Sequence, residues 1–337
     1  MKTRKRCYQI FVIGILLLSL CGCKKDSRQD QAEPTATEEE IPASVPETFV
    51  YTFNPHVISD EYTLIYGEGI REEFFLMCDA ILSGEDSFPC ASKERFHQLL
   101  SISDSCFPLA RELIETEKTE TENGVCHLHY RYDEEKTEKK KTSFIDKVTS
   151  VIETAVPYRE PDCIVTMELF TAVARKDTYD DSYTLEDSLK LRSYRAIMED
   201  IGICQEITGE YIYYLLQVGI DAIPCSSLNR DQSEAHEWTM VKLDGLYYHM
   251  DPTYATTYPD SLFFFGMDDV QREYYGDLPA DRYTYANSDL LDRDTYAVTD
   301  RRFEKYWLAE KYEIDHAEGK ITISEINTDA RHEYMFD

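Results

Sequence analysis

A two-residue turn between two alternating apolar segments constrains this chain more than any other feature. Asp244-Gly245 follows the segment 235–243 and precedes the segment 246–251. Asp-Gly between alternating hydrophobic residues is the strongest short-range signal for a β-hairpin, because both turn residues tolerate positive φ. The sequence therefore predicts two antiparallel strands in which Leu243 faces Leu246.

The register of this hairpin brings a histidine and an aspartate together. Asp251 then faces Trp238, and His236 lies two residues from Trp238 on the same face of the sheet. Diagonal neighbours on one face of an antiparallel pair have Cβ atoms roughly 7 Å apart or less. An imidazole and a carboxylate can bridge that gap, whereas a turn longer by one residue would break the register.

A cysteine precedes the hairpin at the predicted start of a helix. Apolar residues recur three or four positions apart from Ile207 to Val218, and Gly219 follows them, so the pattern predicts a helix with Cys204 in its first turn. Unpaired N–H groups and the positive helix end lower a thiol pKa there. Taken alone, Cys204 is better explained as a buried cysteine that begins a core helix. The nearby histidine and aspartate are what favour a nucleophile.

The three side chains together fit nucleophilic acyl transfer. We expect Cys204 to attack a carbonyl and form a thioester, with helix N–H groups holding the oxyanion. His236 would handle the proton, either as an ion pair with the thiolate or as general base and acid, and Asp251 would orient its ring. His249 is expected to lie on the other strand face with a structural role. A zinc site at the same three residues is the alternative, but no fourth ligand is evident, so we expect neither metal nor cofactor.

The stretch from Ser193 to Tyr258 resembles the core of the bacterial transglutaminase-like superfamily. The resemblance rests on four groups of residues: Gly202-Ile203-Cys204, His236-x-Trp238, Asp244-Gly245-x-Tyr247-Tyr248, and Asp251-Pro252-Thr253-Tyr254. It implies a papain-like α+β fold in which the nucleophile helix packs on an antiparallel sheet carrying the histidine and aspartate. It also implies acyl transfer from amides, by proteolysis, deamidation or cross-linking.

Four residues near the triad refine this expectation. Tyr194 matches a family tyrosine and is expected to help line the oxyanion site, and Trp238 to form a wall of the cleft, with core packing as the alternative for both. Glu237 stands where the family often has a small residue. Glu206 would oppose formation of the thiolate unless its side chain points to solvent.

The N-terminus predicts export. A basic start precedes the apolar stretch 10–20, which is too short to span a membrane comfortably. It ends in Leu20-Cys21-Gly22-Cys23, which resembles a bacterial lipoprotein box. Cys23 is the expected lipidation site because Gly22 before it is small, with Cys21 as the alternative acceptor. The mature chain would then be held by acyl chains at the extracellular face of the bacterial membrane, unless 1–23 is an ordinary signal peptide or anchor helix.

Composition and patterning divide the rest of the chain. The polar, proline-containing stretch 24–56 predicts a disordered tether, followed by a mainly helical N-terminal region, 57–160, a transglutaminase-like core, 161–275, and a C-terminal extension, 276–337. The individual elements expected in these regions are a helix from Ser59 to Leu82, a helix from Lys93 to Ile102 capped by Ser92, a strand from Val125 to Tyr132, a capping box at 184–187, and a terminal hairpin within 311–324.

The formal net charge of −30 disfavours nucleic acid as a partner. Expected substrates are peptides, proteins or cell-wall peptides, with hydrolysis favoured over cross-linking. The alternative is a catalytically silent module of the same fold that binds or scaffolds a partner. Besides Cys204, six cysteines follow the signal region, and they are expected either to pair as disulfides or to stay as buried thiols.

Overall fold

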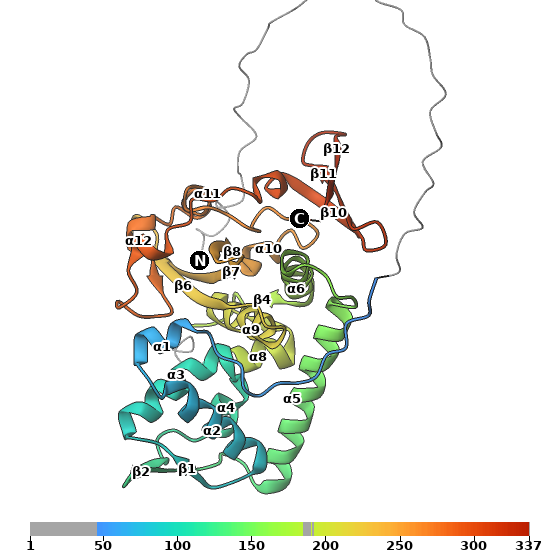
Figure 1. The fold of residues 1–337 in the computed structure, drawn as a ribbon. Helices are drawn as coiled ribbons and strands as arrows, with labels where there is room; N and C mark the ends of the chain where they lie inside the picture. The colour runs from blue at the N-terminus through green and yellow to red at the C-terminus, as the bar shows by residue number, and fades with distance from the viewer. Residues whose placement is uncertain (1–45, 185–189, 191, 337) are drawn as a thin grey trace, which may run out of the picture. The chain divides into compact units, whose positions relative to one another are not determined.

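The computed structural model of this chain describes residues 46–184, 190 and 192–336, and these residues belong to one compact unit (Figure 1). The predicted signal peptide with Cys23 and most of the predicted capping box at 184–187 lie outside the described residues. Within those residues, no helix combines the length and the apolar character needed to cross a membrane.

The N-terminal half is mainly helical, as predicted. Its helices are α1 (Glu61–Tyr66), α2 (Ile70–Ser83), α3 (Lys93–Cys106), α4 (Pro108–Leu113) and the long α5 (Glu134–Ala155). A small antiparallel sheet accompanies them, with strands β1 (Ser87–Pro89), β2 (Glu120–Glu122) and β3 (Val125–His127) in the order β1-β3-β2.

Two of the predicted N-terminal elements differ in the structure. The single helix expected from Ser59 to Leu82 is broken into α1 and α2, because Gly67 and Gly69 both adopt positive φ, at 79° and 84°. The strand expected from Val125 to Tyr132 ends after three residues. The predicted cap of α3 is confirmed, since the Ser92 hydroxyl accepts a hydrogen bond from the Arg95 amide at 3.1 Å.

The central part of the chain is a helix set against an antiparallel sheet. The sheet has the order β8-β7-β6-β9, formed by β6 (Ala222–Leu228), β7 (Ala235–Leu243), β8 (Leu246–Met250) and β9 (Thr284–Tyr285). Helix α9 (Cys204–Gln217) packs on β6 and β7 and also on α3, α6 (Asp162–Lys176) and α8 (Ser193–Glu199) (Figure 1). Every α9 residue from Glu206 to Gln217 is buried, as expected of a helix covered on all sides. The α+β fold class, with the cysteine helix packed on an antiparallel sheet, is confirmed.

The hairpin register is confirmed along the whole of β8, which pairs with residues 239–243 of β7. Leu243 pairs with Leu246, and Thr239 pairs with Met250 at the far end. Asp244 and Gly245 form the turn with φ of 51° and 79°, the positive values that this two-residue connection requires.

The remaining elements surround this core. They are β4 (Thr178–Tyr179) and β5 (Ile201–Gly202), which pair in parallel, then α10 (Pro252–Ala255), α11 (Asp269–Tyr274), α12 (Arg293–Tyr296), the 3₁₀ turns η1 (Ala280–Arg282) and η2 (Glu304–Tyr306), and a C-terminal sheet of β10 (Ala309–Asp315), β11 (Lys320–Glu325) and β12 (Arg331–Met335). The predicted terminal hairpin is confirmed and gains a third strand.

The folded part begins earlier than the predicted boundary at residue 56. Tyr51 is buried, and its hydroxyl donates to the side-chain oxygen of Gln217 at 2.5 Å, at the end of α9. The segment before α1 therefore contributes to the core. The seven cysteines of the described residues are all free thiols, and five of them are buried, so these thiols follow the buried-thiol alternative.

Gly209 shows how closely the helices approach one another. A Cβ added there would lie 2.0 Å from Ser193 Oγ and 3.0 Å from the Asp104 carbonyl oxygen. Replacing a mid-helix glycine by alanine ordinarily stabilises by about 0.5–1 kcal/mol, whereas overpacking a core costs about 1–3 kcal/mol.

We therefore predict that Gly209→Ala lowers the free energy of unfolding by about 1–2 kcal/mol, measured by urea denaturation of the full chain. Adding Ser193→Ala removes the closest clash, so the double variant should be less destabilised than the sum of the single changes. A Gly209→Ala protein at least as stable as the parent would contradict this packing.

Candidate active site

The nucleophile candidate Cys204 is the first residue of α9 and is partly exposed. Strand β5 leads directly into it, and β4 pairs with β5 so that Tyr179 lies opposite Gly202. Burial, and next the nearby Cys204 side chain, raise the pKa of Tyr179. The thiol therefore sits where the prediction places it, at a helix N-terminus, with a tyrosine that the sequence analysis did not single out.

Glu206 neither opposes the thiol nor points to solvent. Its side chain is fully buried, and Oε2 accepts a hydrogen bond from the Ile203 amide at 3.0 Å, so it caps the helix. Arg195 of α8 donates to Oε1 at 2.9 Å and also pairs with Oε2. Burial raises the pKa of Glu206, while the hydrogen bonds from Arg195 and Ile203 lower it in part. The guanidinium thus offsets the negative charge near the sulfur.

The predicted contact between His236 and Asp251 is present. His236 Nε2 lies 2.8 Å from Asp251 Oδ2, and the two side chains are 9% and 0% exposed. Burial by itself lowers the pKa of His236. The negative charge of Asp251 raises it, as do hydrogen bonds with Asp251 and Cys204, and together they hold the pKa well above its usual value. Because Nε2 faces Asp251, Nδ1 is the nitrogen left to face the thiol. The structure therefore brings all three predicted residues together.

The Asp251 carboxylate divides its two oxygens between two tasks. Oδ1 accepts the Tyr254 amide at 3.1 Å and so caps α10, whose first residue is Pro252. Oδ2 faces the imidazole of His236. The motif Asp-Pro-Thr-Tyr thus anchors the carboxylate in the backbone while leaving one oxygen for the histidine. Tyr254 also stacks on the His236 ring, with centroids 4.5 Å apart.

Arg272 is a site residue that the sequence analysis missed. Its side chain is fully buried, and Nη2 lies 3.1 Å from Asp251 Oδ2, while its guanidinium stacks 4.4 Å above the Trp238 ring. Burial raises the pKa of Asp251, but the charges of His236 and Arg272 outweigh burial and hold the pKa below its usual value. The carboxylate is therefore ionised and shared by two cations.

Trp238 and His249 form a rigid support behind the imidazole. Trp238 Nε1 donates to His249 Nδ1 at 2.9 Å, and His249 Nε2 lies 2.8 Å from Asp269 Oδ1. Indole only donates, so Nδ1 of His249 accepts and the proton sits on Nε2. Burial lowers the pKa of His249, which agrees with this neutral form. The structural role expected for His249 is confirmed, but the expected strand face is wrong, because Asp251 and His249 share one face.

Two predicted substrate-contacting residues have other surroundings. Trp238 is fully buried and stacks parallel to His236 with centroids 5.9 Å apart, so it supports the ring and forms no cleft wall. Tyr194 is buried against α5, where its ring stacks on Phe144 at 5.8 Å and lies near Lys140. For both residues the structure shows the core-packing alternative.

No group of three or more His, Cys, Asp or Glu side chains suited to a metal ion occurs in residues 46–184, 190 and 192–336. His127 and His129 are both exposed, and His129 Nδ1 lies 3.3 Å from Glu115 Oε2.

Comparisons with known proteins give a distant structural likeness. No family model and no curated protein matches the chain. A crystal structure described as that of a TGase matches 40% of this chain and 43% of its own at 12% identity, with a TM-score of 0.29. A candidate cysteine protease from Cytophaga hutchinsonii matches 38% of this chain and 50% of its own at 11% identity, with a TM-score of 0.27. The match spans about half or less of each of these structures.

The paired carboxylate gives a direct prediction for His236. We expect Asp251→Asn to lower the pKa of His236, because the charge that raises it is lost, as measured by NMR titration in a Cys204→Ala background. Asp269→Asn is the matched control, since it removes an equally short contact from His249 instead.

The same pair sets a pH dependence of stability. Since the folded-state pKa of His236 is raised, its contribution is complete below the unfolded value of about 6.5 and is lost as pH rises through the folded value. His236→Gln should remove that part of the profile. An unchanged His236 pKa in Asp251→Asn would contradict the ion pair.

Proposed function

We propose that this chain is a thiol-dependent acyl-transfer enzyme acting on peptide or protein amides, with hydrolysis as its main outcome. The observation that carries the proposal is the placement of His236, which interacts with Cys204 at the tip of α9 and is hydrogen bonded to the buried carboxylate of Asp251. A nucleophile, a base and an orienting acid within hydrogen-bond reach are the signature of nucleophilic catalysis.

In the first half-reaction, the Cys204 thiolate attacks the amide carbonyl carbon, a C–S bond forms, and the carbonyl oxygen becomes an oxyanion. The Cys204 amide at the N-terminus of α9 lies beside the sulfur and can donate to that oxyanion. The C–N bond then breaks, and the leaving amine takes the proton from His236 Nδ1. The products are a thioester on Cys204 and a free amine.

In the second half-reaction, His236 removes a proton from water, and the resulting hydroxide attacks the thioester carbon. The C–S bond breaks, so the thiolate is restored and the carboxylic acid leaves. An amine in place of water would give transpeptidation or cross-linking by the same steps. The raised pKa of His236 favours its imidazolium form, which can donate a proton to the leaving amine.

Two properties of the chain support peptides, proteins or cell-wall peptides as substrates. The motifs around the triad resemble those of transglutaminase-like enzymes, which act on amides. The predicted export would also present the site to the cell surface, where water is abundant and hydrolysis is the simplest outcome.

The proposal predicts selective alkylation of Cys204. Among the described cysteines, Cys204 and Cys163 are partly exposed and the other five are buried. With substoichiometric iodoacetamide at neutral pH and peptide mapping by mass spectrometry, Cys204 should react much faster than Cys163. The rate at Cys204 should fall in His236→Ala, because the imidazolium that stabilises the thiolate is gone.

Hydrolysis of a peptide and peptidoglycan panel should disappear in Cys204→Ala and persist in the control Cys163→Ala. Equal alkylation of the two thiols, together with panel activity that survives Cys204→Ala, would favour a binding or scaffolding module and sink the catalytic proposal.

We also propose that the chain is a lipoprotein held at the outer face of the bacterial membrane through Cys23. The support is the basic, apolar and small-residue order of the N-terminus. In an expressing bacterium fed an alkyne fatty acid, the full chain should become labelled, whereas Cys23→Ala should lose the label and leave the membrane fraction. Cys21→Ala is the control and should retain both. If Cys21→Ala loses the label and Cys23→Ala keeps it, the lipidated residue is Cys21.

A further inference from the structure

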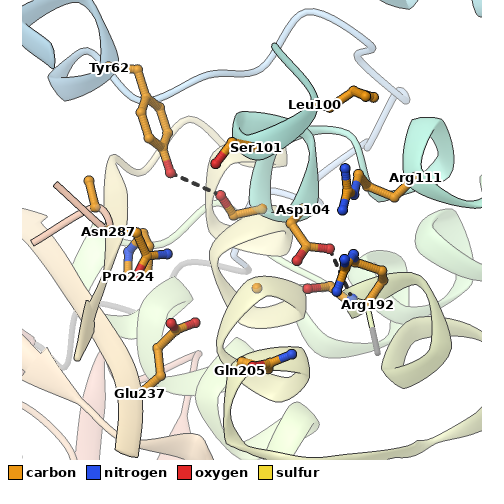
Figure 2. Close-up of a pocket in the computed structure, with 14 residues that line it drawn as sticks. Tyr62, Leu100, Ser101, Asp104, Arg111, Arg192, Gln205, Pro224, Glu237 and Asn287 are labelled. Atoms are coloured by element: carbon orange, nitrogen blue, oxygen red, sulfur yellow. Dashed lines mark hydrogen bonds between the residues drawn. The ribbon is translucent and has the colours of Figure 1, made fainter. Parts of the chain in front are cut away.

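A cavity of about 280 Å³ lies between α3, α9 and the sheet (Figure 2). Gln205 and Glu237 line it, and they directly follow Cys204 and His236 in the chain. The cavity wall therefore begins one residue along the chain from the nucleophile and from the base, and the side chains of His236 and Glu237 leave β7 on opposite faces. The volume falls at the lower limit of small-molecule sites and suits a single side chain or chain end.

One wall of the cavity carries two arginines. Arg111 of α4 and Arg192 just before α8 line it together with Asp104 of α3, on the side away from Glu237 (Figure 2). Burial raises the pKa of Asp104, while the charges of Arg192 and Arg111 lower it, which shows that the three groups interact. This wall therefore presents the N–H donors of two guanidinium groups, in a chain whose formal net charge is −30.

The opposite wall carries Glu237, a carboxyl group whose pKa is raised above its usual value. Burial, and next the charge of Asp104 on α3, raise the pKa of Glu237 to about 8, although His236 and a hydrogen bond with Asn287 lower it. Its other charged or titratable neighbours are Tyr62 of α1 and Cys225 of β6. A neutral carboxylic acid has an O–H to donate. Both walls therefore offer donors to a ligand between them.

We propose that this cavity is the subsite for a carboxylate-bearing group of the substrate, either an acidic side chain or a free C-terminal carboxylate, next to the amide that Cys204 attacks. The inference rests on the proposed function, since it assigns the substrate class of the same site. Guanidinium groups bind carboxylates through paired N–H donors, and Glu237 donates from the other side. Gln205 and Asn287 add amide groups at the cavity edge.

Binding without chemistry tests the subsite. The probes are acetyl-Ala-Xaa-Ala-amide peptides with Xaa as Glu, Gln or Lys, and acetyl-Ala-Gln-Ala with a free C-terminus, titrated calorimetrically into the full chain carrying Cys204→Ala. We expect at least one carboxylate probe to bind about tenfold or more tightly than the Gln and Lys amides. The tighter of the two carboxylate probes identifies the source of the carboxylate.

Variants then assign the effect to the cavity. Arg111→Gln should remove the preference for the carboxylate probe. Arg175→Gln is the control and should keep this preference, because Arg175 is an exposed residue of α6 that pairs with Asp260. Binding of the carboxylate probe should weaken as pH rises through about 8, where Glu237 ionises, and Glu237→Gln should abolish this pH dependence. The Glu237 variant provides an independent readout if Arg111→Gln fails to fold.

Equal binding of the Glu, Gln and Lys probes, a preference for Lys, or no binding of any probe would overturn the subsite. So would a carboxylate preference that survives Arg111→Gln and shows no pH dependence. These outcomes are separable from failure of the catalytic proposal, since selective alkylation of Cys204 does not involve the cavity, and peptide binding to Cys204→Ala does not require the thiol.

Discussion

The buried carboxylate of Asp251 is the interaction on which the site depends. An ionised carboxylate that is fully removed from water costs several kcal/mol unless cations and hydrogen bonds compensate for the loss of hydration. Here His236 and Arg272 face one oxygen, and the first turn of α10 faces the other. Removing any one partner leaves the others with an uncompensated charge. The orientation of the imidazole is therefore coupled to the strand end, to α10 and to α11.

The cysteine end of the site is arranged by a second buried charge. Glu206 lies in the first turn of α9, where a carboxylate satisfies the helix terminus but would also repel a thiolate. Arg195 on α8 pairs with that carboxylate, so the helix keeps its cap without a net negative charge near Cys204. Arg192, just before α8, and Asp104 of α3 also line the cavity. The N-terminal helical region thus packs on the nucleophile helix through α3 and contributes Asp104 and Arg111 to the proposed substrate subsite.

Close packing explains why these parts are held together. Gly209 lets α8 and α3 approach α9 to within contact of its backbone, and Tyr51 ties the segment before α1 to Gln217 at the other end of α9. The rings of Tyr254 and Trp238 both lie nearly parallel to the imidazole of His236 and pack against it. A ring held this way keeps one nitrogen toward the carboxylate and the other toward the sulfur, which is the preorganisation that acyl transfer needs.

Local patterns determined much of this arrangement from the sequence alone. Asp244-Gly245 dictates a two-residue turn, and the turn sets which residues face each other, so the meeting of His236 with Asp251 could be derived before any fold was known. The helix beginning at Cys204 likewise follows from its apolar period. Local pattern did not predict the break between α1 and α2 at Gly67 and Gly69, because the apolar spacing continues across these two glycines.

Only the tertiary structure decided the contacts between distant segments. Arg272 stands 21 positions after Asp251 in the sequence, in a short helix with no periodic signal, and its role appears only when that helix packs against the sheet. From the sequence, Glu206 is expected to oppose a thiolate, but in the structure Arg195 pairs with it. Tyr194 is expected to line the site, but in the structure its ring packs on Phe144. The pairing of residues in a hairpin is fixed locally, because the turn sets the register of both strands. The partners of a buried charge come from segments distant in the sequence, so they are known only once the core is packed.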